Sequence, residues 1–258
     1  MREVAGPPGA PTVVLLHGWV ASGGLNWFRA FEPLSEHFRV IAVDLRGHSR
    51  GLRTRRVFRL ADCADDTAAT LEELGTGPAI AVGYSMGGPV AQLLWRRHRD
   101  LVSGLVLCAT AGGFMPGARE RILYQSMMAA AVTATRFGSI ANRLPGVPRV
   151  APFALSRPGT LPPWAAAELR RHDWRMLLEA GHSLGTYHAG RWLPEIDVPT
   201  AVVLTTDDAA VAPGLQYKMA MAIPGATVHP LDDGHLACAR DEFGASLSLV
   251  CHQVADRT

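Results

Sequence analysis

The chain has 258 residues, of which 48% are hydrophobic and 19% are charged, and its net charge is +2. This composition is typical of a well-buried globular protein and excludes a disordered chain. The near balance of charge favours neither a nucleic-acid nor a membrane partner, and the four widely spaced cysteines form no zinc pattern. No apolar run is long enough for a signal peptide or a membrane span, so we expect a soluble, cytoplasmic protein.

Short apolar runs alternate with longer helical patterns along most of the chain. The runs expected to be strands lie at 12–16, 40–44, 79–83, 104–108, 201–205 and 227–230. Helical patterns lie between them, at 26–37, 60–74, 87–97, 214–222 and 241–255. Several runs are apolar at consecutive positions, as in parallel strands covered on both faces. We therefore predict an α/β fold with a doubly wound, mostly parallel sheet of about six to seven strands.

The interval from residue 111 to residue 199 has no convincing strand. Its helical patterns at 119–137 and 165–180 are rich in methionine, alanine and leucine. A long helical insertion of this kind is either a cap over a site or additional core, and we favour the cap. We expect a core of residues 1–111 and 196–258, and a helical cap of residues 112–195 inserted after the strand at 104–108.

The pentapeptide Gly83-Tyr84-Ser85-Met86-Gly87 follows a buried-strand run and precedes a helical pattern. A sharp strand-to-helix turn lifts a serine out of a sheet, and the flanking glycines let the strand and the helix pass closely. An ordinary glycine-rich turn is the structural alternative. The context favours Ser85 as a nucleophile.

A serine nucleophile needs a base and a group that orients the base. His235 lies in Asp233-Gly234-His235-Leu236, after the run at 227–230 and before a helix, which makes it the preferred base. The acid is expected at the end of the preceding strand, where Asp207 and Asp208 are adjacent. Chemistry alone leaves both aspartates open.

The developing oxyanion needs two backbone N–H donors. One is expected from Met86, directly after the nucleophile, and the other from Trp19 in the loop Leu16-His17-Gly18-Trp19. We expect His17 to be structural. The ring of Trp19 is expected to line the substrate pocket.

Taken together, these motifs resemble the α/β-hydrolase fold superfamily, in the branch with a His-Gly oxyanion loop and a helical cap. The matching segments are Leu16-His17-Gly18-Trp19, Asp44-Leu45-Arg46-Gly47-His48-Ser49, Gly83-Tyr84-Ser85-Met86-Gly87, Asp208-Ala209-Ala210-Val211-Ala212-Pro213, Ile223-Pro224-Gly225-Ala226 and Gly234-His235. The resemblance implies Asp208 rather than Asp207 as the acid, because in the family two residues separate the acid from a Val-x-Pro turn, as Ala209 and Ala210 do here. It also implies that the segment 44–49 is structural.

The chain departs from the family at its N-terminal side. The family begins with an antiparallel hairpin, whereas only eleven residues precede the His-Gly strand here. We expect the first strand to be absent and residues 2–5 to be a remnant of the second. The exposed sheet edge that results could be covered by dimerisation, so a monomer and a homodimer both stay open.

The expected activity is acyl transfer on an apolar carboxylic ester or lactone, a small-molecule substrate, by Ser85, His235 and Asp208, with no metal and no organic cofactor. Trp19, Tyr84, Met127 and Trp164 are the expected pocket residues. Two alternatives stay open: use of the same triad for carbon–carbon bond hydrolysis, perhydrolysis or a lyase or cyclase step, and a non-catalytic ligand receptor.

Overall fold

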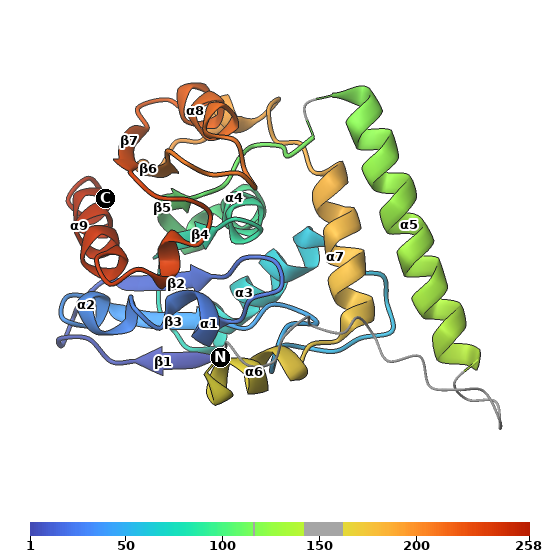
Figure 1. The fold of residues 1–258 in the computed structure, drawn as a ribbon. Coiled ribbons are helices and arrows are strands. Elements are labelled where there is room, and N and C mark those ends of the chain that lie inside the picture. Colours follow the sequence, from blue (N-terminus) through green and yellow to red (C-terminus); the bar gives the residue numbers. More distant parts are fainter. Residues whose placement is uncertain (116, 142–161) are drawn as a thin grey trace.

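A computed structural model describes residues 1–115, 117–141 and 162–258. It contains a seven-stranded sheet in the order β1-β3-β2-β4-β5-β6-β7, in which only β1 is antiparallel to its neighbour (Figure 1). The predicted mostly parallel α/β sheet is thus confirmed. The strands are β1 (Arg2–Val4), β2 (Thr12–Leu16), β3 (Arg39–Val43), β4 (Ala79–Tyr84), β5 (Val102–Cys108), β6 (Thr200–Thr205) and β7 (Thr227–Leu231).

Successive side chains of a strand point to opposite faces of the sheet, and in the central strands both sets are buried because helices cover both faces. On β2, Val14 and Leu16 join one core cluster, while Val13 and Leu15 join the other. The first cluster is covered by α3 (Leu60–Glu73), α4 (Gly87–Arg97) and α8 (Pro213–Ala222). The second is covered by α1 (Gly23–Trp27), α2 (Phe31–Ser35) and α9 (Phe243–Ala255). Short 3₁₀ turns complete the core, at Arg99–Leu101, Leu193–Glu195 and Ala237–Ala239.

The helix expected at 26–37 is two short helices instead, α1 and α2. One continuous helix would place Pro33 in its interior, where the proline ring meets the carbonyl of Arg29 and an N–H is missing. In the structure Pro33 lies in the first turn of α2, where helices tolerate proline. Ser22 caps α1 by accepting a hydrogen bond from the N–H of Leu25.

Between β5 and β6 the described residues form α5 (Ala118–Ala141), α6 (Pro163–Arg170) and α7 (Trp174–Thr186). Helices α5 and α7 lie side by side, and hydrogen bonds join Tyr124 to the carbonyl of Gly181 and Gln125 to that of Gly185 (Figure 1). In this interval the part of the chain that the structure describes has no strand beyond one isolated bridge, between Gly113 and His188.

The prediction of a single helix at 165–180 is wrong, because the chain turns between α6 and α7. Asp173 begins α7: its carboxylate accepts the N–H of Met176, and its own N–H donates to the carbonyl of Gly47. His172 lies in this turn and is 6% exposed, so it belongs to a buried contact between α6, α7 and the core.

Residues 2–4 form an edge strand that pairs antiparallel with β3, in the register Arg2 opposite Ala42. The strand is short, and Glu3 forms an ion pair with Arg39 beside it. A short, charged edge strand offers little pairing surface to another chain. Within the described residues, no helix has the length and apolar character needed to cross a membrane.

Candidate active site

Ser85 lies in the turn between β4 and α4 with a backbone φ of 51°, in the left-handed region that a serine rarely adopts. The turn is held because the N–H of Ser85 donates to the carbonyl of Cys108 at 2.9 Å and the hydroxyl of Thr110 donates to the carbonyl of Ser85 at 2.7 Å. A Cβ at Gly87 would overlap the carbonyl oxygen of Leu16. Glycine at position 87 therefore allows the close crossing of β2 and α4 that exposes Ser85.

His235 follows β7 and lies between Ser85 and Asp208. Its Nε2 is 3.0 Å from the Ser85 Oγ, and its Nδ1 is 2.8 Å from the Asp208 Oδ2. An ionised carboxylate only accepts hydrogen bonds, so the Nδ1 carries the proton and donates to Asp208. The Nε2 then carries no proton and can accept a hydrogen bond from the Ser85 hydroxyl.

Asp208 is 4% exposed and is surrounded by donors. Its Oδ1 accepts the N–H groups of Ala210 and Val211, both at 2.8 Å. Its Oδ2 accepts the hydroxyl of Thr205 at 2.8 Å in addition to His235. Burial opposes ionisation, but the hydrogen bonds from His235, Val211 and Thr205 outweigh it and lower the pKa of Asp208. The carboxylate is therefore charged at neutral pH.

The neighbouring aspartate has a different position. The side chain of Asp207 is exposed, and its backbone N–H donates to the carbonyl of Asp233. The structure thus brings Asp208, and not Asp207, to His235.

The loop after β2 carries the expected oxyanion donor. A Cβ placed on Gly18 would lie 3.3 Å from the Cβ of Ser85, so this backbone runs beside Ser85. The N–H of Gly18 is already occupied, since it donates to the Asn26 Oδ1 at 2.9 Å. The N–H groups of Trp19 and Met86 donate to no acceptor among the described residues, which leaves them available to a ligand.

The side chain of His17 hydrogen-bonds both to this loop and to the backbone after β3. Its Nε2 accepts the N–H of Leu45 at 2.9 Å, so its Nδ1 carries a proton and donates to the carbonyl of Gly18 at 2.7 Å. Burial lowers the pKa of His17 to about 3, against the opposing effect of the Gly18 carbonyl. His17 is therefore a neutral, fully buried residue that shapes the loop.

Two side chains that support the site carry no signal that sequence reasoning could use. Asn26 on α1 accepts the N–H of Gly18, and Gln216 on α8 donates to the hydroxyl of Thr205 at 2.9 Å. Each is an amide inside a helical pattern and resembles a surface position in the sequence. Only the packing of α1 and α8 against the strand ends shows that both are buried.

Tyr84 does not line a pocket. Its side chain is 2% exposed and packs in the core, and its hydroxyl donates to the backbone carbonyl of His235 at 2.9 Å. It ends β4, and its ring lies in the second core cluster, where it meets the rings of Trp27 and Phe243 edge-on. The pocket prediction for Tyr84 is corrected to a supporting contact.

Met127 and Trp164 also differ from the prediction. Met127 is 60% exposed, whereas its neighbour Met128 is buried and packs near Gly181 of α7 and the ring of Trp19. Met128 lies four residues after Tyr124, on the same face of α5, so helical spacing was the signal that could have found it. Trp164 is 46% exposed, and its ring meets Phe28 edge-on in a surface hollow that contains no triad residue. Trp19 itself is partly buried, and its indole contacts α7.

A family model for the α/β hydrolase fold matches residues 11–162, and the chain belongs to this family.

Among characterised relatives, the chain is 33% identical over 238 residues to a pimeloyl-[acyl-carrier protein] methyl ester esterase of Chromobacterium violaceum, covering 81% of this chain and 90% of that protein. It is 30% identical over 238 residues to a magnesium-chelatase 30 kDa subunit of Rhodobacter capsulatus, covering 90% of this chain and 82% of that protein. The solved structure of a thermophilic esterase from Thermogutta terrifontis is similar over 100% of this chain and 93% of its own, with 27% identity and a TM-score of 0.73.

Proposed function

We propose that the protein is a serine hydrolase that cleaves carboxylic esters by acyl transfer. The observation that carries this proposal is the hydrogen-bonded series from the Ser85 hydroxyl through His235 to Asp208, with distances of 3.0 and 2.8 Å. This is the arrangement in which a histidine accepts the proton of a serine while a buried carboxylate fixes its tautomer.

In the proposed reaction, the Ser85 Oγ attacks the ester carbonyl carbon as the His235 Nε2 takes the hydroxyl proton. The carbonyl oxygen becomes an oxyanion that accepts hydrogen bonds from the N–H groups of Trp19 and Met86. The tetrahedral intermediate collapses when the protonated histidine gives its proton to the leaving alcohol. Water, deprotonated by the same histidine, then releases the acid from Ser85. Asp208 stabilises the imidazolium in both half-reactions.

The substrate class rests on the relatives and on the cap. Two of the proteins described above are named esterases, and the Chromobacterium relative is named for a methyl ester. In our proposal, residues 112–195, of which 116 and 142–161 lie outside the described residues, belong to a cap over the site, and the contact between Trp19 and α7 supports this placement. The buried Met128 beside Trp19 favours an apolar ester or lactone.

A fluorophosphonate probe tests the nucleophile directly. We expect wild-type protein to be labelled, Ser85→Ala to lose the label, and Ser246→Ala on α9 to keep it. Failure of the wild type to label would contradict the proposal and favour a non-catalytic receptor.

A series of p-nitrophenyl acetate, butyrate and octanoate then tests the reaction. We expect hydrolysis that falls by about 10³-fold or more in Ser85→Ala. A protein that is labelled but cleaves no ester or lactone would instead favour carbon–carbon bond hydrolysis or another use of the same triad.

A further inference from the structure

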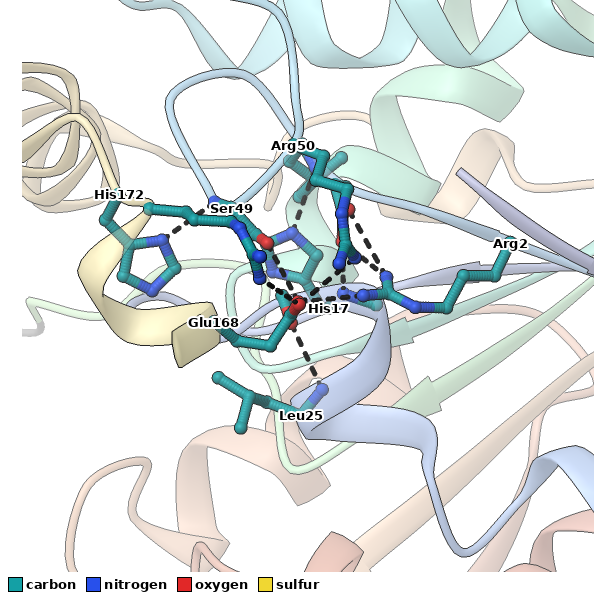
Figure 2. A network of polar contacts seen from close by, with 12 residues as sticks. Arg2, His17, Leu25, Ser49, Arg50, Glu168 and His172 are labelled. Carbon is teal, nitrogen blue, oxygen red and sulfur yellow. Dashed lines mark hydrogen bonds and ion pairs between the residues drawn. The ribbon is translucent and has the colours of Figure 1, made fainter. Parts of the chain in front are cut away.

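One carboxylate of the inserted helices is buried against three separate segments of the core. Glu168 of α6 is 5% exposed. Figure 2 shows its contacts with Arg2, Ser49 and Arg50. Its Oε2 accepts hydrogen bonds from Arg2 at 2.7 Å, Ser49 at 2.8 Å and Ser22 at 2.9 Å. Its Oε1 meets Arg50 and Arg171, each at 3.1 Å. Of these five partners, only Arg171 follows α6 itself.

The carboxylate stays charged at neutral pH. Burial opposes its ionisation, but the hydroxyls of Ser49 and Ser22 and the guanidinium of Arg2 together lower the pKa of Glu168 to about 2. A buried charge with this many donors is strongly tied to its position, because removing any donor leaves part of the charge uncompensated.

Ser22 connects Glu168 to the proposed oxyanion loop through hydrogen bonds. The Ser22 Oγ donates to Glu168 and accepts the N–H of Leu25, so it caps α1 and binds the inserted helix with one atom. Four residues after this cap, the Asn26 Oδ1 accepts the N–H of Gly18. Glu168 is thus connected through Ser22 and α1 to the backbone that carries the Trp19 N–H.

The carboxylate of Glu168 also accepts a hydrogen bond from Ser49, which lies in a different loop. Ser49 has a φ of 43° and Val20 a φ of 59°, values that cost free energy for residues with a side chain, especially a β-branched one. The N–H of Ser49 donates to the His172 Nδ1 at 2.8 Å, and its hydroxyl donates to Glu168 (Figure 2). Such conformations persist only where surrounding contacts stabilise them. For Ser49 these contacts are the hydrogen bonds to Glu168 of α6 and to His172 in the turn after α6.

We propose that Glu168 is a positioning residue for acyl transfer: through Ser22 it holds the oxyanion loop in the conformation that aims the Trp19 N–H at the substrate. The proposal rests on the proposed hydrolase function. It makes the docking of α6 a condition for full activity, since the loop loses a fixed anchor when α6 moves away. Misplacement of an oxyanion donor lowers the rate of the chemical step more than substrate binding.

Glu168→Gln and Glu179→Gln form a matched pair for the test. Glu179 of α7 is 3% exposed and accepts hydrogen bonds from the N–H of Phe58 and from Arg175, two residues outside the loop at 17–26. With p-nitrophenyl butyrate we expect kcat of Glu168→Gln to fall by about 10- to 100-fold with KM changed by less than about threefold. Glu179→Gln is expected to keep kcat within about threefold of the wild type, since its bonds to Phe58 and Arg175 lie outside the oxyanion loop. An equal loss of kcat in both variants would show a merely structural role and overturn the proposal.

Hydrogen exchange of the peptide that spans residues 17–26 gives a readout that does not depend on ester hydrolysis. Exchange there is expected to be faster in Glu168→Gln than in the wild type and in Glu179→Gln. Unchanged exchange would overturn the positioning role even if the wild type is an active esterase. Conversely, a wild type without esterase activity but with faster loop exchange in Glu168→Gln would reject the hydrolase function and keep the tie between Glu168 and the loop.

Ser22→Ala serves as the second variant if Glu168→Gln does not fold. It removes the connecting hydroxyl and leaves Arg2, Ser49 and Arg50 on the carboxylate. We expect the same pattern of faster exchange at residues 17–26 and lower kcat at nearly constant KM. Wild-type exchange and kcat in Ser22→Ala would contradict the proposed route.

Discussion

The indole N–H of Trp19 donates a hydrogen bond to the backbone carbonyl oxygen of Leu177 at 2.8 Å. Trp19 belongs to the loop after β2 and Leu177 to α7, so this bond joins the proposed oxyanion loop to the inserted helices. The ring also packs on α7, since a Cβ at Gly181 would lie 2.7 Å from its Cζ2. The loop is therefore hydrogen-bonded to the insertion through Trp19 on α7 and through Ser22 on α6.

Trp19→Phe keeps an aromatic ring and removes the donor to Leu177. We expect the free energy of unfolding to fall by about 1 kcal/mol, because one partly buried hydrogen bond is lost and a carbonyl loses its partner. We also expect KM for p-nitrophenyl butyrate to rise, since α7 is held less firmly. Urea unfolding and steady-state kinetics measure the two effects.

Trp164→Phe is the control for this change, because Trp164 is 46% exposed and its ring contacts Phe28 away from the triad. Its KM is expected to match that of the wild type. Equal changes in the two variants would contradict a specific role for the bond from Trp19 to Leu177.

Asp208→Asn is expected to lower kcat by about 10³- to 10⁴-fold, because an amide can present its NH₂ group to the histidine and favour the wrong tautomer. Asp207→Asn is the matched control: the residue is adjacent, its side chain is exposed, and it has no hydrogen bond to His235. Its kcat should stay near that of the wild type. Ester hydrolysis measures both variants, and an equal loss in both would overturn the assignment of Asp208.

Gly87→Ala is expected to destabilise the protein by more than about 3 kcal/mol, because the added Cβ overlaps the carbonyl of Leu16 and the two backbones must separate. Gly214→Ala on α8 meets no atom within 4 Å and should be neutral or stabilising by about 0.5–1 kcal/mol through its helix propensity. Urea unfolding curves of the two variants test this opposition. A stable Gly87→Ala would contradict the close crossing at the turn.

Acid is expected to destabilise the protein below about pH 6.5, through buried neutral histidines. Burial lowers the pKa of His17 to about 3, and burial is also the largest cause that lowers the pKa of His48. For each histidine the pKa in the folded protein lies below the pKa in the unfolded chain. The stabilisation from each neutral imidazole is therefore complete above the unfolded pKa and is lost as the pH falls below that value. The slope approaches about 1.4 kcal/mol per pH unit for each histidine.

Urea unfolding between pH 8 and pH 5 measures this slope. His48→Phe should lower the slope by the share of one histidine, whereas His37→Gln, at an exposed position, should leave it unchanged. A free energy of unfolding that does not change over this range would contradict the assignment of His17 and His48 as buried neutral groups.

Much of the architecture was predictable because its signals are local. Alternate residues of β2 enter opposite cores, and the glycines around Ser85 follow from steric contact within one turn. The helix boundaries at Pro33 and Asp173 were missed. The boundary at Pro33 follows from the proline itself, whereas the boundary at Asp173 depends on a distant residue, because the N–H of Asp173 donates to the carbonyl of Gly47.

The amino-acid sequence by itself determined the order of strands and helices, the sharp turn at Ser85 and the candidate base His235, because short-range sterics and hydrophobic periodicity control these features. Residue chemistry alone did not show whether Asp207 or Asp208 is the acid, since both follow the same strand. The prediction of Asp208 rested on the resemblance to the family. The tertiary structure decided which carboxylate meets the imidazole, through Thr205 and the backbone beyond Asp208. It also decided the contacts of Glu168, whose partners Arg2, Ser22 and Ser49 lie more than a hundred residues away along the chain. A buried charge acquires its function from the donors that folding brings to it, and no local pattern records them.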